Sequence, residues 1–388
     1  MPGPTEPAAV LERLLAALAA ELPAAVQLRH ALHAAPDLSH EERATAALVA
    51  ERLPVAASTA ATTGLLARVG EGLGPAVAVR AELDGLPVIE RTGADFSATG
   101  AAMHACGHDV HMAALVALTR AAAKLGELPA PLLAIFQPSE EAYPSGAQQL
   151  AGEGFAARAV VGAHIHPELE WGSVALDPGV VNAASDTVEI TVRGEPSHGA
   201  YPHLGRDPIL AIAQIVVALH AQLGRRADPL APAALNVGVL EGGRLENVIP
   251  PSARARVSLR AHHERERLAL RELVEEVVHG VAAAHGCVGE LELIAGEPAL
   301  ENDARIVAAA RELLARAGFE QAPAWRSCGS DDFAFFEALA PLAMAFVGLA
   351  GAPGFTVRPL HHPELLPPDE AVAAVARAQA ALYVAASY

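Results

Sequence analysis

The sequence is poor in cysteine, in aromatic residues and in positive charge. Its three cysteines, Cys106, Cys287 and Cys328, are an odd number and widely spaced in a chain of 388 residues, which is too long to depend on disulfides for its core. We therefore expect a reducing, cytoplasmic location. Aromatic residues make up 4% of a chain that is 52% hydrophobic, which is typical of helices alternating with buried strands and not of a Trp- and Tyr-rich binding module.

The shortage of positive charge excludes two classes of partner. Lys and Arg number 27 against 45 Asp and Glu, a net charge of −18, which repels phosphate backbones and anionic lipid. We expect no nucleic-acid partner and no membrane partner, since no apolar run reaches the roughly 18 residues that a membrane span requires. The apolar stretch 14–20 is short and bracketed by Glu12 and Glu21, and it predicts an amphipathic helix. What the chain does hold is 17 histidines, which directs attention to metal sites.

Helices and buried strands alternate in the first 178 residues. The pattern predicts helices over 6–22, 41–53 and 111–125, and short apolar runs at 76–80, 132–136 and 159–163 that suit strands buried on both faces of a largely parallel sheet. The same pattern resumes after residue 300, with helices over 303–317 and 368–386 and a buried strand at 344–347.

The middle of the chain has a different pattern. Residues 186–193 alternate strictly between apolar and polar, which predicts a strand with one solvated face. Asp207 and Pro208 then begin a helix, and strands at 235–239 and 255–259, a helix over 264–284 and a strand at 290–294 follow. This β-α-β-β-α-β order predicts a small ferredoxin-like α+β domain at 181–295, inserted into a discontinuous α/β domain formed by 1–180 and 296–388.

The segment 103–109, MHACGHD, is the strongest local signal for chemistry. The thiolate of Cys106 and the imidazole of His108 can face one centre only in a looped backbone, which Gly107 permits. Sulfur and nitrogen ligands together favour zinc, with manganese, cobalt or nickel as alternatives. A buried structural cysteine beside a helix-capping histidine is the competing interpretation of this segment alone.

Three other polar segments follow predicted buried strands. Glu140 and Glu141 follow the run 132–136, His164 and His166 follow 159–163, and His361 follows 344–347. Ligand sites of open α/β sheets gather outside the carboxyl ends of the strands. The coincidence therefore favours one shared site over unrelated surface residues.

The motifs taken in order resemble a known family. They are LRHALHAAPDLSHEE (28–42), RAELDGLPV (80–88), MHACGHD (103–109), FQPSEE (136–141), GAHIHP (162–167), SHGAYPH (197–203), GGRLENVIP (242–250), GSDDF (329–333) and LHHP (360–363). This series is similar to the metal-dependent amidohydrolases that include hippurate hydrolases, N-acyl amino acid aminoacylases and auxin-conjugate hydrolases. The resemblance implies a zinc-exopeptidase-like α/β/α catalytic domain with an inserted lid domain that often dimerises.

The resemblance also implies roles for individual residues. The metal ligands would be Cys106, His108, Glu141, His164 and His361, holding two divalent ions with Cys106 shared between them. Glu140 matches the general base, and Asp84 and Asp109 are candidate acceptors for the N–H groups of ligand imidazoles. On the lid, His198 matches a residue that stabilises the oxyanion, often in the partner subunit's site, while Asn247 and Arg260 match positions that hold the substrate carboxylate.

The sequence departs from the family pattern at a few places. Residues 142–146, AYPSG, replace a glycine-rich stretch, so we expect an altered acyl pocket. Glu82 and Asp331 replace an Asp and a Glu, and neither is expected to touch the ligands. We expect His104, His111, His166, His203 and His362 to support or cap rather than to bind metal.

The sequence thus predicts a binuclear, metal-dependent amidohydrolase. It would cleave the amide bond of a small N-acyl amino acid or similar conjugate with metal-activated water and a Glu base, as a homodimer joined through the lid. A dipeptidase or carboxypeptidase on the same scaffold is the nearest alternative. A protein that retains the site but only binds metal or ligand is an alternative from a different class.

Overall fold

The computed structural model describes residues 6–72 and 74–388, and the chain divides into two compact units. The large unit comprises the chain up to Gly179 together with Glu301–Trp325 and Asp332–Tyr388, and the inserted unit comprises Val180–Leu300 and Arg326–Asp331. Nothing in the sequence indicated that the short segment 326–331 belongs to the inserted unit.

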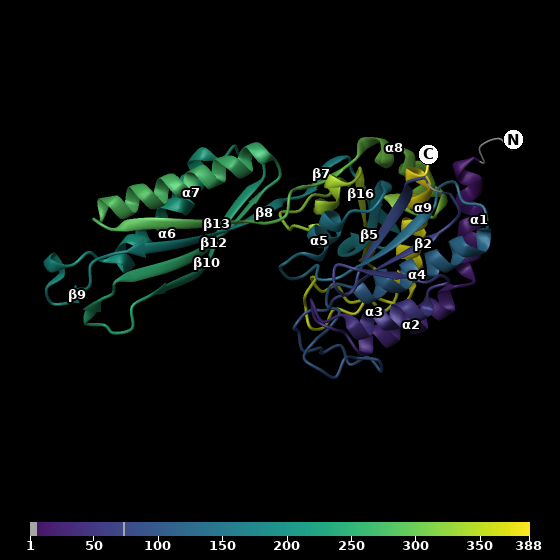
Figure 1. The fold of residues 1–388 in the computed structure, drawn as a ribbon, viewed down its shortest axis with the longest axis horizontal. Helices are drawn as coiled ribbons and strands as arrows, with labels where there is room; N and C mark the ends of the chain where they lie inside the picture. Colours follow the sequence, from purple (N-terminus) through teal and green to yellow (C-terminus); the bar gives the residue numbers. More distant parts are fainter. Residues whose placement is uncertain (1–5, 73) are drawn as a thin grey trace. The chain divides into compact units, whose positions relative to one another are not determined.

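A mixed sheet forms the centre of the large unit (Figure 1). Among the described residues its strand order is β1-β2-β4-β3-β5-β16-β6-β15. Their bounds are β1 Ser58–Ala60, β2 Gly64–Val69, β3 Ala76–Glu82, β4 Leu132–Gln137, β5 Ala157–Glu170, β6 Ser173–Ala175, β15 Glu320–Gln321 and β16 Leu342–Ala350. The four predicted apolar runs are β4, β3, β5 and β16, which pair in parallel as expected for strands buried on both faces. The antiparallel pairing of β2 with β4 was not predicted.

Helices cover both faces of this sheet. They are α1 Pro7–Ala19, α2 Leu22–Ala34, α3 Arg43–Arg52, α4 His108–Leu125, α5 Gly146–Glu153, α8 Ala304–Arg316 and α9 Glu370–Ala386, with a 3-10 helix η2 at Asp332–Ala338. The predicted helix over 6–22 is in fact α1 ending at Ala19 and a second helix, α2, beginning at Leu22. Pro23 lies in the first turn of α2, where its missing N–H costs nothing, so the chain restarts a helix there.

The core of the large unit lies between the sheet and α1, α2, α4, α8 and α9. Val77, Val79 and Ala81 of β3 alternate into this core beside buried residues of α4 and α9. On the other face, Gly162 of β5 lets Met344 and Phe333 approach, because a Cβ at Gly162 would lie 2.9 Å from the Met344 sulfur. Because these central strands are buried and tightly packed, the loops that follow them are held in fixed positions, as a precise site requires.

The inserted unit has the predicted β-α-β-β-α-β order. Its elements are β8 Ala184–Arg193, α6 Pro208–Arg226, β10 Ala233–Gly242, β12 Ser252–Ala261, α7 Glu264–Ala284 and β13 Val288–Ala295, and the sheet order is β10-β12-β8-β13. A two-stranded ribbon joins β9 (Ser197–His198) to β11 (Val248–Ile249), η1 covers Pro202–Leu204, and β7 (Gly179–Asn182) pairs with β14 (Leu300–Asn302).

Helix α6 begins as predicted. The Asp207 side chain accepts hydrogen bonds from the N–H groups of Ile209 and Leu210, and Pro208 is the first helical residue. In the described part of the chain α6 is the single helix long and apolar enough to meet the criteria for a membrane span, which is weak evidence by itself. Its residues Ile212 and Ile215 are buried in the core of the inserted unit.

Candidate metal centre

The five predicted metal ligands lie together in the large unit. Cys106 Sγ is 3.5 Å from His164 Nε2, and ligand atoms of Cys106, His108 and Glu141 all lie within 4.8 Å of one another. Glu141 Oε1 is 4.0 Å from His108 Nε2 and 3.2 Å from His361 Nε2. The structure therefore brings together side chains that are up to 255 positions apart in the sequence, from Cys106 to His361.

Gly107 makes the turn that presents Cys106 and His108. Its φ of +82° is in the left-handed region, and it is the N-cap of α4, which therefore begins at His108 and not at the predicted 111. A Cβ at Gly107 would lie 2.3 Å from Ile165 Cδ1. The glycine thus lets the ligand turn pack directly on β5.

We expect Gly107→Ala to damage the metal centre more than a matched glycine at the other end of α4. Gly126 also has a positive φ, +74°, but a Cβ there meets nothing within 4 Å. Gly126→Ala should cost about 1–2 kcal/mol of stability for the left-handed backbone alone. Gly107→Ala has the same backbone cost and also places a Cβ too close to the Ile165 side chain. It should therefore weaken metal affinity roughly 10-fold or more, measured by titration of the apoprotein. Equal metal affinity in the two variants would contradict this account.

Two ligand histidines are oriented by backbone carbonyls. His108 Nδ1 donates to the Asp84 carbonyl at 2.8 Å, and His164 Nδ1 donates to the Ile165 carbonyl at 2.7 Å. In both rings Nδ1 is therefore engaged and Nε2 is the nitrogen left for a metal, which would displace the Nε2 proton of His108 on binding. His108 Nε2 is buried and makes no hydrogen bond within residues 6–72 and 74–388.

The turn that carries Glu140 and Glu141 is held by a buried carboxylate. Ser139 has a φ of +49°, and its N–H donates to Glu42 Oε1 at 2.8 Å, as does the N–H of His40 at 2.9 Å. Thr63 Oγ1 donates to the other Glu42 oxygen at 2.7 Å. Sequence reasoning missed Glu42, although it lies in the quoted segment 28–42, because an acidic pair at a helix start is ordinarily solvated.

His361 reaches the centre from a second strained position. Its φ is +68°, and its N–H donates to the Ala105 carbonyl at 2.8 Å. This bond ties the C-terminal loop to the residue that precedes Cys106. Strained backbone of this kind persists where the surrounding structure determines it and is common at functional sites.

The electrostatics of the centre favour a cation. Burial raises the pKa of the Cys106 thiol well above its usual range, and Glu141, Glu140 and Glu82 raise it further. Burial alone would lower the pKa of His108, but Glu82 and Asp84 outweigh it and raise that pKa to about 10. Burial holds the pKa of His164 well below its usual range, which keeps that ring neutral. One thiol, three imidazoles and a carboxylate around this negative cluster are a donor set that fits divalent metal ions.

Glu82 lies near the ligands without bonding them. Its carboxylate is within 4.8 Å of ligand nitrogens of His108 and His164, but its hydrogen bonds go to His111 and Arg80. It lies this close because β3 runs to Glu82 beside α4, so the last strand residue faces the helix start. His164 and His166 lie inside β5 and not after it, because the strand continues and pairs with β16.

The expected acceptors for the ligand imidazoles also need correction. His108 Nδ1 donates to the backbone carbonyl of Asp84. The nearer carboxylate oxygen of Asp84, Oδ1, is 3.6 Å from the same nitrogen. Asp109 instead accepts from Arg29 Nε at 3.1 Å and lies 3.0 Å from His33 Nδ1, because it is on the α4 surface that faces α2.

Supporting histidines behave differently from one another. His111 bonds Glu82, His166 packs on Trp325 and Phe346, and His362 accepts from the N–H of Glu364. His104 is buried, and neither of its nitrogens has a hydrogen-bond partner in the described ranges.

The three predicted lid residues lie in the inserted unit. His198 of β9 pairs with Val248 of β11, and the Asn247 carbonyl accepts from the Gly199 N–H at 2.7 Å, so His198 and Asn247 are neighbours on one ribbon. Arg260 lies separately on β12, where its Nη1 donates to Ser330 Oγ at 2.6 Å.

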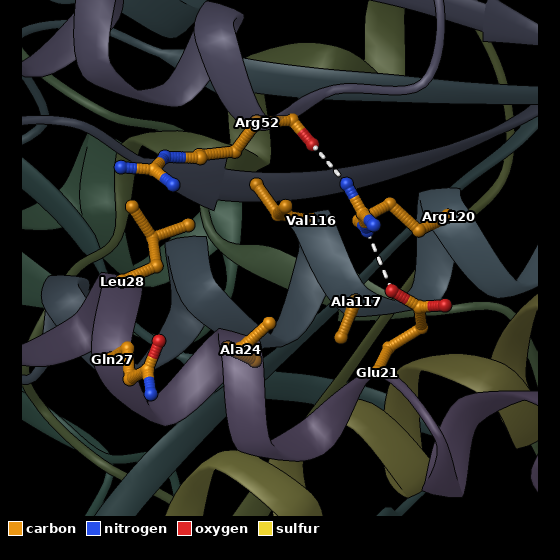
Figure 2. A pocket seen from close by; sticks show the side chains of 9 residues that line it. Glu21, Ala24, Gln27, Leu28, Arg52, Val116, Ala117 and Arg120 are labelled. Atoms are coloured by element: carbon orange, nitrogen blue, oxygen red, sulfur yellow. Dashed lines mark hydrogen bonds and ion pairs between the residues drawn. The ribbon is translucent and has the colours of Figure 1, made fainter.

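A separate pocket of about 210 Å³ lies among α2, α3 and α4 (Figure 2). Arg120 at its rim donates through Nε to the buried Glu21 at 2.5 Å and through Nη1 to the Arg52 carbonyl at 3.2 Å. Its other described lining residues are Ala24, Ala25, Gln27, Leu28, Val116 and Ala117, none of which belongs to the metal centre.

Known proteins match this chain over most of its length. The N-acetyl-L-cysteine deacetylase of Bacillus subtilis (strain 168) is 34% identical over 349 residues, covering 86% of this chain and 83% of that protein. The N-acyl-L-amino acid amidohydrolase of Geobacillus stearothermophilus is 33% identical, covering 71% of this chain and 77% of that protein. The crystal structure of the Bacillus subtilis YXEP protein, described as a dinuclear metal binding peptidase from the M20 family, matches with a TM-score of 0.82 and 28% identity over 94% of this chain and 98% of that one.

The match to a family model settles the relationship. Residues 78–384 match the model described as "Peptidase family M20/M25/M40". That stretch includes all five residues gathered at the candidate metal centre and the whole inserted unit. The catalytic and lid organisation expected from the resemblance is therefore shown, and the chain belongs to the peptidase family M20/M25/M40.

Proposed function

We propose that this protein hydrolyses the amide bond of small N-acyl amino acids and uses two divalent metal ions to do so. The observation that carries the proposal is the gathering of Cys106, His108, Glu141, His164 and His361 around one point, with Glu140 beside them. The names of the relatives, an N-acetyl-L-cysteine deacetylase and an N-acyl-L-amino acid amidohydrolase, support this substrate class.

The five gathered side chains would hold the two ions, with the Cys106 thiolate shared. When bound, such ions polarise a carbonyl and lower the pKa of water. Zinc suits the mixture of sulfur and nitrogen ligands, and manganese, cobalt and nickel are the alternatives. His108 and His164 would contribute Nε2, since a backbone carbonyl engages Nδ1 of each ring.

Glu140 would move the proton. Its Oε2 is 3.8 Å from His108 Nε2, and its side chain is 14% exposed, so it borders the ligands while remaining accessible to a substrate. The carboxylate would accept a proton from the attacking water and later give it to the nitrogen of the leaving amine. The C–N bond breaks, and the products are the carboxylic acid and the free amino acid.

His198 has the tautomer needed to donate a hydrogen bond. Its Nδ1 accepts from the Ala200 N–H at 3.1 Å, so the proton of the neutral ring is on Nε2. We propose that this N–H stabilises the oxyanion and that the protein is a homodimer joined through the inserted unit. Sedimentation of the active protein should show a dimer, and a fully active monomer would contradict this part of the proposal.

Asn247 and Arg260 would hold the substrate carboxylate, and Arg260 allows a sharp test. Arg260→Lys keeps the charge but loses the planar fork that binds a carboxylate through two N–H groups. We expect KM to rise about 10-fold, from a loss of about 1.5–3 kcal/mol for a charged hydrogen bond, with a smaller change in kcat. Arg254→Lys is the control, since Arg254 is on the same strand and is exposed. An equal KM increase in both variants would remove Arg260 from the substrate site.

A substrate panel with and without metal tests the proposed function. N-acetyl amino acids, N-benzoyl amino acids and dipeptides would be compared on the metal-loaded protein and on the chelated apoprotein. We expect hydrolysis of N-acyl amino acids that is lost on chelation and restored by added Zn²⁺ or Mn²⁺. Preference for dipeptides would favour the peptidase alternative, and a purified protein with almost no bound metal and no activity would favour a non-catalytic role.

A further inference from the structure

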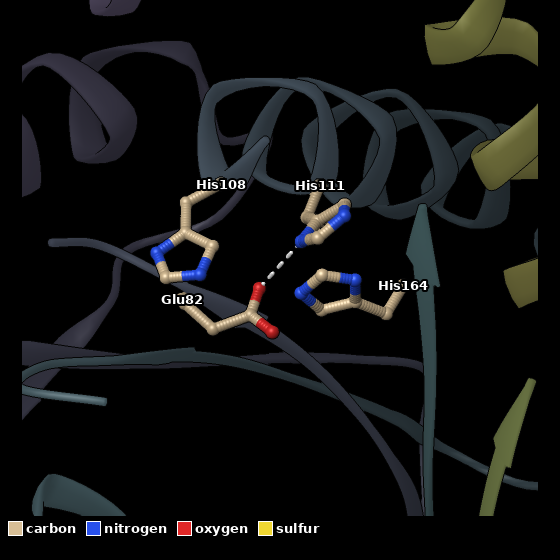
Figure 3. A group of neighbouring side chains, drawn as sticks. All are labelled: Glu82, His108, His111 and His164. Atoms are coloured by element: carbon tan, nitrogen blue, oxygen red, sulfur yellow. Dashed lines mark hydrogen bonds and ion pairs between the residues drawn. The ribbon is translucent and has the colours of Figure 1, made fainter. Parts of the chain in front are cut away.

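A further group of potential metal ligands shares two members with the five gathered side chains. Glu82, His108, His111 and His164 are all buried and offer ligand atoms within 4.8 Å of one another (Figure 3). His108 and His111 project from α4, and His164 projects from β5 toward them. By residue type and spacing alone, His111 and Glu82 could complete a metal site. The hydrogen bonds of His111 show otherwise for that residue.

Both nitrogens of the His111 ring are already engaged. Its Nε2 lies 3.0 Å from the backbone N of Ile165, and a backbone N–H can only donate, so Nε2 is an acceptor. The ring proton of the neutral imidazole is therefore on Nδ1, which donates to Glu82 Oε2 at 2.8 Å. No lone pair of His111 remains for a metal.

Glu82 is held in place from its other side. Arg80 donates to the second Glu82 oxygen, and Arg80 also bonds Gln137 at 2.8 Å and Asp332 at 3.1 Å. Arg80 and Glu82 are 1% and 2% exposed, so this ion pair is out of contact with solvent. The pair gives the His111 ring a fixed and charged partner.

Ile165 connects His111 to the ligands. Its N–H bonds His111, its carbonyl accepts from His164 Nδ1 at 2.7 Å, and its side chain packs against Gly107 between Cys106 and His108. The position of this one residue therefore determines both the orientation of the His164 ring and the packing of the ligand turn.

We propose that His111 is a positioning residue and not a metal ligand. Through the N–H of Ile165 it fixes the backbone segment that sets the tautomer and orientation of His164, and Glu82 fixes the tautomer of His111. This inference rests on the proposed metal centre. Removing partners of this kind lowers metal affinity without removing a ligand.

Metal titration of two variants tests the role. His111→Asn keeps an amide N–H near the Nδ1 position for Glu82 but cannot reach the Ile165 N–H, whereas His111→Phe removes both bonds. Thr119→Val is the matched control, because Thr119 is a buried polar residue of α4 that bonds only the Leu115 carbonyl of its own helix. Each apoprotein would be titrated with Co²⁺ while the thiolate-to-cobalt absorption band is recorded, after circular dichroism has established folding.

We expect both His111 variants to bind Co²⁺ about 10–100-fold more weakly than the control, with the same number of ions and the same thiolate band. Loss of one ion per chain in either variant would make His111 a ligand and overturn the inference. Affinity equal to that of Thr119→Val would reduce His111 to a core residue and overturn it as well. Wild-type protein that binds no cobalt would instead overturn the proposed function, and this inference with it.

A measurement on the wild-type protein keeps the test independent of variant folding. The histidine ring nitrogens would be observed by ¹⁵N NMR during Zn²⁺ addition, with His111 assigned by the coupling of its Nε2 to the Ile165 amide nitrogen across their hydrogen bond. We expect the Nε2 signals of His108 and His164 to move to metal-bound positions while His111 stays protonated on Nδ1. A metal-bound shift of His111 Nε2 would overturn the proposal.

Discussion

Glu140→Gln should lower kcat for amide hydrolysis by about 100-fold to 10,000-fold while leaving the metal content unchanged. The substitution keeps the size of the side chain but replaces a carboxylate that can accept a proton with an amide that cannot. Glu140 borders His108 without belonging to the group of Cys106, His108 and Glu141 ligand atoms. Its loss should therefore affect proton transfer and not metal binding.

The adjacent residue provides the matched control for this experiment. Glu141→Gln removes a proposed ligand one position along the same turn, and we expect it to lower metal occupancy together with activity. Metal content would be measured by mass spectrometry of the metals and activity on an N-acetyl amino acid. Full activity of Glu140→Gln, or metal loss equal to that of Glu141→Gln, would show that Glu140 is not the base.

Cys106→Ala should remove both ions and with them all measurable hydrolysis. A thiolate shared by two divalent ions contributes to both, so its removal weakens both sites at once. The measurement is the number of metal ions per chain after dialysis.

The other two cysteines serve as controls. Cys287 is buried in the core of the inserted unit and Cys328 is exposed, and neither belongs to the ligand group. Cys287→Ala and Cys328→Ala should retain their metal, and Cys287→Ala should lose about 1 kcal/mol of stability through a small cavity. Two ions still bound to Cys106→Ala would contradict the shared thiolate, and loss of one ion alone would assign Cys106 to a single site.

Much of the fold followed from local patterns. The strict alternation of 186–193 became β8, and Asp207 followed by Pro208 began α6. These predictions succeed because the periodicity of a strand and the capping of a helix depend on residues only a few positions apart. The break between α1 and α2 was missed because the apolar pattern continues across it, and the antiparallel strand β2 was missed because its pairing with β4 is remote in sequence.

The candidate ligands could also be named from the sequence, but their surroundings could not. Residue types and motif order were enough to select Cys106 and its four companions, which the structure brings together. Glu42, which holds the Ser139 turn, had no distinguishing signal because its partner lies 97 positions away. Asp109 was expected to accept from the ligand imidazoles for a similar reason, because its actual partners Arg29 and His33 are 80 and 76 positions away in the sequence.

The sequence by itself determined which side chains are available and in what order, and its resemblance to a known family pointed to three histidines, one cysteine and one glutamate as one candidate site. Only the tertiary structure decided which ring nitrogen of each histidine is free. That choice depends on hydrogen bonds such as the one between His111 and the Ile165 N–H, 54 positions apart, which exist only when β5 and α4 pack together. The sequence indicated a supporting role for His111, and the structure supplies the reason: the folded backbone already uses the lone pair that a metal would need.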